Sequence, residues 1–313
     1  MNEFICGVCP HHCRLTEGKY GFCRARLCRD GMIIPENYGR LTAISMDPIE
    51  KKPFARFFPG SYILSVGSYG CNLRCPFCQN ASISQVGGQN MDISTSDECA
   101  ETPSGKCDEP ALRTCGKDDS GPRKNEPSVD CRVLMPDALA SLAADIPDNL
   151  GIAFTYNEPL ISWEYIRDTG RLLRQKSPEK KIALVSNGMA SPEVIEALLP
   201  YIDAANIDLK GDADFYRKEL AGSLQTVMDT ITLLAAHCHV EITTLVISGK
   251  NDSDEWISRE AAWIASLDPE IPLHLSRCFP RYHSHIPATP RETILRLKRT
   301  AENYLKYVYP GNM

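Results

Sequence analysis

The sequence lacks the features that would direct the chain to a membrane or to nucleic acid. It contains no run of about 18 apolar residues and no basic stretch followed by an apolar one at its N-terminus. Long runs of lysine and arginine are also missing, and the formal net charge is −6, whereas nucleic-acid surfaces are usually basic. We therefore expect a cytoplasmic globular protein that binds neither membranes nor nucleic acid.

Cysteine, by contrast, is abundant, with 14 in 313 residues. Because the cytoplasm keeps thiols reduced, these cysteines do not indicate a disulfide framework. The binding of a metal or of an iron–sulfur cluster is the leading interpretation. They fall into three groups and two isolated positions: Cys6, Cys9, Cys13, Cys23 and Cys28; Cys71, Cys75 and Cys78; Cys99, Cys107, Cys115 and Cys131; and Cys238 and Cys278 alone.

Short apolar runs alternate with helical patterns from about residue 60 onward, which is typical of β/α units around a parallel sheet. The predicted strands are 62–66, 151–155, 182–186, 204–208, 240–247 and 272–276, with a further candidate at 306–309. Six units predict the α/β class and a partial (β/α)6 barrel.

Helix-start signals lie between these strands, most of them a proline beside an acidic residue. Helices are predicted at 138–144 after Pro136-Asp137, at 160–175 after Pro159 and at 194–199 after Ser191-Pro192-Glu193, and two more begin at 253–255 and 289–292. We divide the chain into a cysteine-rich N-terminal region at 1–58 and the barrel at 59–313.

One segment, at about 87–131, interrupts the β/α pattern. It is rich in Gly, Ser, Asp, Glu, Lys and Pro and nearly devoid of large apolar side chains, so it cannot bury enough apolar surface to offset the entropy of ordering. We expect a flexible insert that serves as a lid or a docking loop. Its cysteines are too widely spaced to match a ferredoxin or a zinc finger.

The most informative motif follows the first predicted strand directly, where residues 67–80 read GSYGCNLRCPFCQN. Thiolates of Cys71, Cys75 and Cys78 can ligate three irons of a [4Fe–4S] cubane and leave the fourth iron open to a substrate. Phe77 is placed to cover an adenine ring. The carboxyl ends of barrel strands carry the chemistry in β/α barrels. A structural zinc site in a binding module without catalysis is the alternative.

Further motifs surround this loop: DPIEKKP at 47–53, CQN at 78–80, TYNEP at 155–159, NIDLKG at 206–211 and YVYPGN at 307–312. With them, the chain resembles the AmmeMemoRadiSam-system proteins of the radical S-adenosylmethionine (SAM) superfamily, which are relatives of the pyruvate formate-lyase activating enzyme. The resemblance implies that the cluster cleaves SAM to methionine and a 5′-deoxyadenosyl radical. That radical abstracts hydrogen from a small molecule or a protein side chain, and a carrier such as flavodoxin or ferredoxin supplies the electron.

The resemblance also implies SAM-binding side chains at the strand ends. It places Asn157 and Glu158 beside the amino group of SAM. It places Ser186 and Asn187 beside the ribose or the carboxylate. The alternative for Glu158 is a solvated residue at a helix start.

Three further residues are implied near SAM or the substrate, namely Asp208, Lys210 and Arg277. Asp208 and Lys210 could instead form an ordinary ion pair, and Arg277 could be a surface arginine. Glycyl-radical activation is an alternative function, but Val185 stands where the activating enzymes carry an aspartate.

The N-terminal cysteines form a separate pattern. Cys6, Cys9, Cys13 and Cys23 have the spacing C-x2-C-x3-C-x9-C, which is close to that of a metal knuckle. Four such thiolates could hold either a structural zinc ion or a second iron–sulfur cluster. Cys28, His11 and His12 offer alternative ligands.

Overall fold

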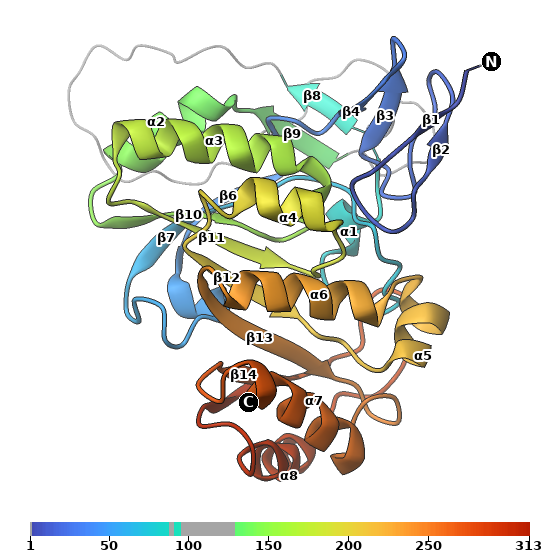
Figure 1. The fold of residues 1–313 in the computed structure, drawn as a ribbon, viewed down its shortest axis with the longest axis vertical. Coiled ribbons are helices and arrows are strands. Elements are labelled where there is room, and N and C mark those ends of the chain that lie inside the picture. Colours follow the sequence, from blue (N-terminus) through green and yellow to red (C-terminus); the bar gives the residue numbers. More distant parts are fainter. Residues whose placement is uncertain (1, 88–90, 95–128) are drawn as a thin grey trace.

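The computed structural model describes residues 2–87, 91–94 and 129–313 (Figure 1). Its N-terminal region contains short antiparallel pairs and turns that hold the first cysteines. The strands are β1 (Phe4–Ile5) with β2 (Arg14–Leu15), β3 (Arg26–Arg29) with β4 (Met32–Pro35), and β5 (Arg40–Leu41). In Figure 1 this region lies beside the short helix α1 (Ala81–Ser84).

The core of the molecule is an eight-stranded sheet. Its strands, from one edge to the other, are β15 (Val308–Gly311), β14 (Leu273–Arg277), β13 (His239–Val246), β12 (Ala204–Asp208), β11 (Lys181–Ser186), β10 (Asn149–Phe154), β7 (Tyr62–Gly67) and β6 (Ala43–Pro48). All neighbours are parallel except β6, which is antiparallel to β7. The predicted α/β class and partial barrel are confirmed, and the candidate seventh strand is β15. The sequence did not predict β6.

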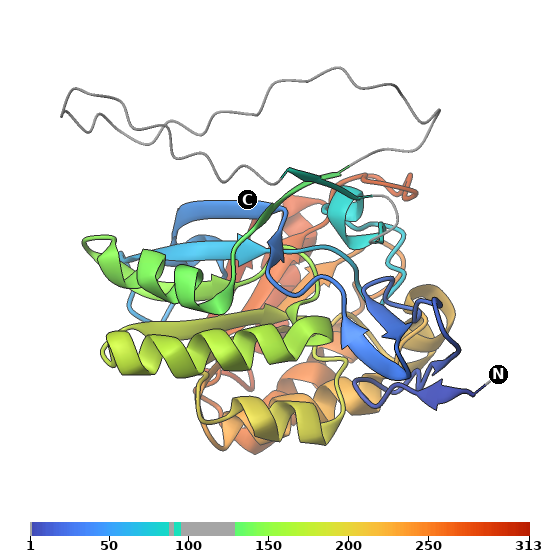
Figure 2. The same ribbon diagram turned by 90° about the horizontal axis from the view of Figure 1, so that it is seen from above.

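Helices cover the outer side of this sheet (Figure 2). They are α2 (Pro136–Asp145), α3 (Trp163–Lys176), α4 (Pro192–Leu198), α6 (Leu224–Ala235), α7 (Asp254–Leu267) and α8 (Arg291–Ala301), with shorter turns η1 (Ile49–Lys51), η3 (Pro159–Ser162), α5 (Ala213–Phe215) and the π-helical η4 (Tyr216–Leu220). The predicted helices are present. The sequence did not predict α6, whose start is the serine cap Ser223.

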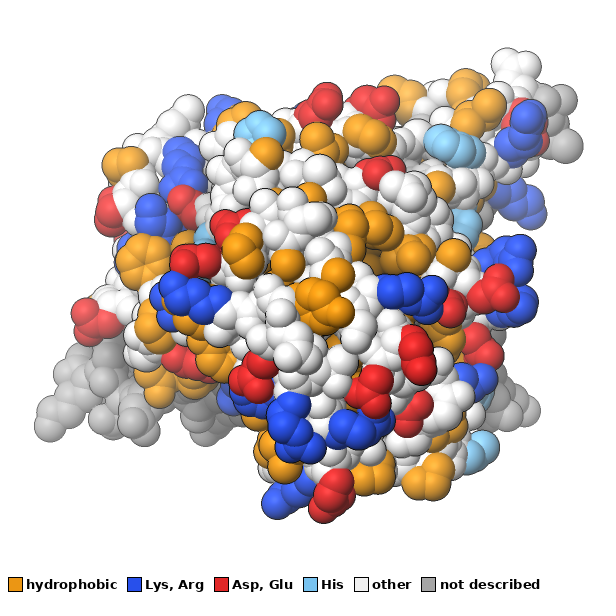
Figure 3. Space-filling model, turned by 60° about the horizontal axis from the view of Figure 1, so that its bottom comes forward, with side chains coloured by type: hydrophobic (Ala, Val, Ile, Leu, Met, Phe, Trp, Pro, Cys, Tyr) orange, Lys and Arg blue, Asp and Glu red, His pale blue; other side chains and the backbone are white. Residues whose placement is uncertain are grey.

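The surface carries charges of both signs. On the face shown in Figure 3, lysine and arginine side chains alternate with aspartate and glutamate, and apolar side chains lie between them. Among the described helices, none combines the length and the hydrophobicity that crossing a bilayer requires.

The segment that connects β6 to β7 fills the inside of the barrel with apolar side chains. Phe54 is fully buried there and packs against small side chains on three adjacent strands. These are Ala153, Ala183 and Ala204, which lie in one row because each is the register partner of the next. The three alanines thus leave room for one phenylalanine ring.

A buried carboxylate holds the same segment in place. Glu241 on β13 is inaccessible to solvent and accepts hydrogen bonds from the backbone N–H groups of Ala55 and Arg56, at 2.9 and 2.8 Å. Its oxygens also bond His274 at 2.6 Å and His239 at 2.9 Å. Burial alone would raise the pKa of Glu241, but these donors lower it to about 2.

The ends of the predicted insert form strands. β8 (Met91–Ser94) and β9 (Val129–Val133) are parallel, and β9 also pairs with β5. Cys131 on β9 is buried. Cys99, Cys107 and Cys115 lie outside the described residues.

Gly151 on β10 offers a steric test of this sheet. Its φ is +156°, and an added Cβ would lie 1.8 Å from the backbone oxygen of Lys181 on β11. We expect Gly151→Ala to lower the free energy of unfolding by about 3 kcal/mol or more in urea titrations. Gly60→Ala is the control, because Gly60 has φ +84° in open space and should cost only about 1–2 kcal/mol. Equal losses in the two variants would contradict the close approach of β10 and β11.

Glu260 on α7 makes stability depend on pH. It is buried and accepts a hydrogen bond from Thr244, and burial raises its pKa from 4.5 to about 8. The folded state therefore keeps a proton that the unfolded chain loses, so stability falls as pH rises from about 4.5 to about 8. We expect Glu260→Gln to be more stable than the wild type at pH 9, by on the order of a few kcal/mol, and equal to it near pH 4. The exposed Glu255→Gln on the same helix should show no such trend, and identical pH profiles for wild type and Glu260→Gln would refute the assignment.

Candidate functional site

The three motif cysteines lie on one loop, residues 68–80, which we call the cluster loop and which begins where β7 ends. Gly70 is required in it, because its φ is +85° and an added Cβ would lie 2.6 Å from the backbone oxygen of Cys23. The N–H of Cys71 donates to the same oxygen at 3.2 Å. The N-terminal region therefore packs directly on the cluster loop.

The thiols of the cluster loop are neighbours in a desolvated site. Burial raises the pKa of Cys71 well above its usual value, and the nearby Glu158 and Cys75 raise it further. Burial likewise raises the pKa of Cys75 to about 11. Such thiols become thiolates only with a compensating cation, and a bound metal centre supplies one.

The arrangement of these thiols fits a cluster better than a single ion. Throughout residues 2–87, 91–94 and 129–313, no three His, Cys, Asp or Glu side chains come together around one point where a metal ion could bind. In a cubane each thiolate bonds a different iron, so the ligands surround the cluster without converging. Cys71, Cys75 and Cys78 meet that requirement and leave one iron without a ligand from the loop.

A buried carboxylate beside the loop joins three of the residues predicted to bind SAM. Glu158 is 1% exposed. It accepts a hydrogen bond from the Ser186 hydroxyl at 2.7 Å and another from the Asn187 N–H at 2.8 Å. It also accepts from the N–H of Leu160 at 2.9 Å and so caps η3, as the alternative for this residue expected. Burial raises the pKa of Glu158 to about 7 despite these donors.

The side chain of Asn187 continues this network to the cluster loop. Its amide donates to Asn72 Oδ1 at 2.9 Å and to Cys71 Sγ at 3.6 Å. Asn72 is fully buried and donates to the backbone oxygen of Met189 at 2.6 Å. The sequence analysis did not single out Asn72, and its only signal was its position between Cys71 and Cys75.

Asn157 also contacts the cluster loop. Its Oδ1 accepts from the N–H of Ser68 at 2.9 Å, and its Nδ2 donates to the backbone oxygens of Tyr69 and Gly70, both at 3.1 Å. The side chain therefore shapes the start of the loop. Its role toward SAM stays a prediction.

Asp208 and Lys210 form the ion pair that was the alternative for them, with 2.7 Å between Nζ and Oδ2. The Lys210 side chain is mostly buried, which would lower its pKa, but Asp208 and Cys75 raise the pKa instead. The influence of Cys75 places the ammonium group near the cluster loop.

Phe77 and Arg277 have partners within the protein. Phe77 is buried, and its ring stacks on Phe215 with 6.2 Å between centroids and 7° between planes. Arg277 donates to the backbone oxygens of Thr289 at 2.7 Å and Asn312 at 3.4 Å. Their contacts with SAM stay predictions.

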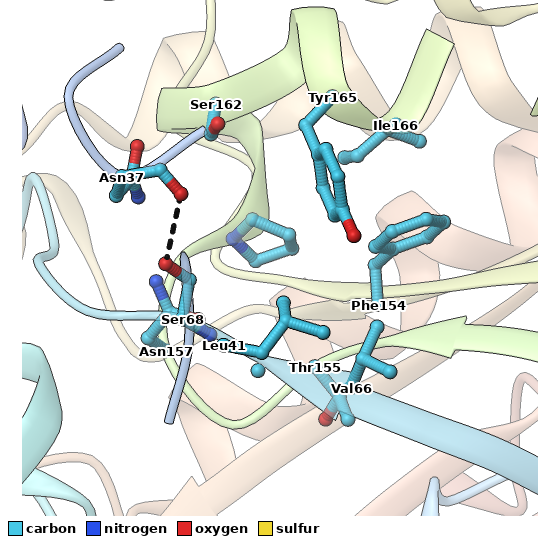
Figure 4. Close-up of a pocket in the computed structure, with 12 residues that line it drawn as sticks. Asn37, Leu41, Val66, Ser68, Phe154, Thr155, Asn157, Ser162, Tyr165 and Ile166 are labelled. Carbon is cyan, nitrogen blue, oxygen red and sulfur yellow. Dashed lines mark hydrogen bonds between the residues drawn. The ribbon is translucent and has the colours of Figure 1, made fainter. Parts of the chain in front are cut away.

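Behind the cluster loop, between β7, β10 and α3, lies a small cavity of about 20 Å³ (Figure 4). One wall is apolar, with Phe154, Tyr165 and Ile166, and the other is polar. Asn37 Oδ1 and Ser162 Oγ line it and are buried without a hydrogen-bond partner in the described part of the chain. The cavity has room for one water molecule and is far too small for SAM.

Comparison with known proteins agrees with this geometry. Residues 65–261 match the radical SAM superfamily model. An uncharacterized protein of Methanocaldococcus jannaschii, MJ0808, is 32% identical over 318 residues, which cover 100% of this chain and 82% of that protein.

Solved structures show the same fold at low identity. A radical SAM methyltransferase from Sphaerobacter thermophilus has a TM-score of 0.51 and 13% identity over 81% of this chain and 67% of that chain. A domain of the pyruvate-formate lyase-activating enzyme from Bacteroides vulgatus has a TM-score of 0.44 and 22% identity, over 52% of this chain and 99% of that chain. The matched family model spans the cluster loop and most of the parallel sheet, and the chain therefore belongs to the radical SAM superfamily.

Proposed function

We propose that the protein binds a [4Fe–4S] cluster through Cys71, Cys75 and Cys78 and uses it to cleave SAM. When bound, the cluster supplies one electron to the sulfonium of SAM, which yields methionine and a 5′-deoxyadenosyl radical. The radical abstracts hydrogen from a small molecule or a protein side chain. The observation that carries this proposal is the group of three neighbouring thiols on one loop, hydrogen-bonded through Asn187 to the network of Glu158.

The remaining side chains of the site orient SAM. We assign the amino group of SAM to the neighbourhood of Glu158 and Asn157, and its ribose or carboxylate to that of Ser186 and Asn187. Asp208 and Lys210 supply a fixed pair of charges near Cys75. Phe77 and Arg277 contribute an aromatic face and a cation toward the adenine or the carboxylate.

The N-terminal region at 1–58 is, in this proposal, a cysteine-rich cover for a barrel at 59–313. Arg74 of the cluster loop supports it, because its guanidinium lies 3.8 Å from the centroid of the Phe22 ring and donates to the backbone oxygens of Phe22 and Cys71. A low-potential carrier such as flavodoxin or ferredoxin supplies the electron. A reducing compartment such as the cytoplasm suits 14 cysteines.

Glycyl-radical activation is the second candidate within this chemistry. Val185 packs against the apolar group around Phe54 and offers no carboxylate. We therefore favour a substrate other than a glycyl-radical enzyme. Adding such an enzyme with SAM and dithionite and recording its glycyl radical by electron paramagnetic resonance (EPR) separates the two.

The cluster assignment predicts what loss of a ligand does. We expect Cys71→Ala, Cys75→Ala and Cys78→Ala each to abolish the formation of 5′-deoxyadenosine from SAM and dithionite, because a cubane needs all three thiolates. Product is measured by chromatography on anaerobically reconstituted protein. Cys238→Ala, far along the chain from the loop, should keep full activity. An intact cluster in the wild type without any 5′-deoxyadenosine would overturn the proposed function.

The network beside the loop predicts a milder effect. Asn187→Ala leaves the buried Asn72 Oδ1 without its donor, and an unsatisfied buried acceptor costs about 1–3 kcal/mol. We expect SAM cleavage to slow about tenfold or more while the iron bound by the cluster loop is retained. The exposed Asn303→Ala on the surface should behave like the wild type. Unchanged SAM affinity and rate in Asn187→Ala would remove this residue from the site.

A further inference from the structure

The four N-terminal cysteines lie next to the cluster loop in space. Cys6, Cys9 and Cys23 are buried, and Cys13 is half-buried. Burial raises the pKa of Cys9 to about 12, and the nearby thiols of Cys23 and Cys6 raise it further. Cys6 likewise raises the pKa of Cys23. These thiols are therefore close neighbours.

The local backbone around these thiols repeats that around Cys71. The N–H of Leu73 donates to Cys71 Sγ at 3.4 Å. In the same way, Cys9 accepts from the N–H of His11, two residues later. Cys23 accepts from Ala25 and Arg26, two and three residues later. N–H donors aimed at sulfur stabilise thiolates, the form in which cysteine binds a metal.

Cys13 completes the set. Its Sγ accepts a hydrogen bond from the N–H of Phe22 at 3.2 Å, and the Cβ of an alanine at Gly21 would lie 3.6 Å from it. The turn before Cys23 thus presents its backbone to Cys13. Cys28 does not join, because it lies on β3 with its thiol 4.0 Å from Glu17.

A hydrogen-bonded path connects this group to the thiols of the cluster loop. The side chain of Asn72 bonds the Cys9 thiol, and the same side chain accepts from Asn187, which also donates to Cys71 Sγ. His11 Nε2 lies 2.8 Å from the backbone oxygen of Asn72. Asn72 thus lies between the two groups of thiols, fully buried.

We propose that Cys6, Cys9, Cys13 and Cys23 hold a second iron–sulfur cluster, adjacent to the first and joined to it through Asn72. Like the thiols of the cluster loop, these four are neighbours that do not converge on one point within the described residues, as cubane ligands need not. Four thiolates saturate such a cluster, which makes it an electron carrier. It takes one electron from a low-potential external carrier and passes one electron to the first cluster, and no bond forms or breaks at it.

This inference rests on the proposed function for its first cluster, and metal analysis tests it separately from catalysis. We expect the anaerobically reconstituted wild type to contain about eight iron atoms per chain. The triple variant Cys71→Ala, Cys75→Ala, Cys78→Ala should keep about four, with an EPR signal after reduction by dithionite. About four irons with one zinc per chain in the wild type would overturn the proposal, as would an iron-free triple variant with wild-type circular dichroism.

Single variants keep the test decisive if the triple variant does not fold. Cys13→Ser should reduce the iron content from about eight to about four or slightly more, because a cubane rarely survives with three ligands of a four-cysteine set. Cys28→Ala, in the same region and fully buried, should stay at about eight. Equal iron in Cys13→Ser and Cys28→Ala would refute the site. Failure of the proposed function would appear differently, as absence of 5′-deoxyadenosine from a wild type with full iron content.

Discussion

The buried carboxylate of Glu158 is the interaction on which the geometry of the site depends. A carboxylate that is 1% exposed is costly unless donors surround it. Its donors are the start of η3 and the end of β11, through Leu160, Ser186 and Asn187. Because Asn187 then reaches Asn72 and Cys71, the position of the cluster loop follows from one desolvated charge.

The opposite end of the barrel interior is filled by the protein itself. Phe54 occupies the space above a row of alanines, and Glu241 binds the backbone of the same segment. The motif DPIEKKP, at 47–53, belongs to this closure: Asp47 accepts from Tyr156 at 2.6 Å and pairs with Lys52 at 2.8 Å. Parallel strands place their carboxyl ends at one edge. With one end of the barrel filled, the chemistry is confined to the end that carries the cluster loop.

The N-terminal region relates to the cluster loop through backbone as much as through side chains. Gly70 has no Cβ, so the backbone of Cys23 can approach it and accept from the N–H of Cys71. The stacking of Arg74 on Phe22 adds a contact across the same boundary. A rigid contact of this kind keeps two groups of thiols at a constant separation, which is the condition for electron transfer between metal centres.

The sequence by itself determined the features that local patterns encode. These are the seven parallel strands, the helices with proline or serine starts, and the three thiols of one loop, since periodicity and spacing depend only on neighbours along the chain. It did not reveal β6, a half-exposed edge strand, or α6, whose only start signal is Ser223. Only the tertiary structure decided that Glu158 meets Ser186 and Asn187, and that Asn72 lies between Cys9 and Cys71. Such contacts join distant parts of the chain, and they form only when the sheet brings the strand ends together.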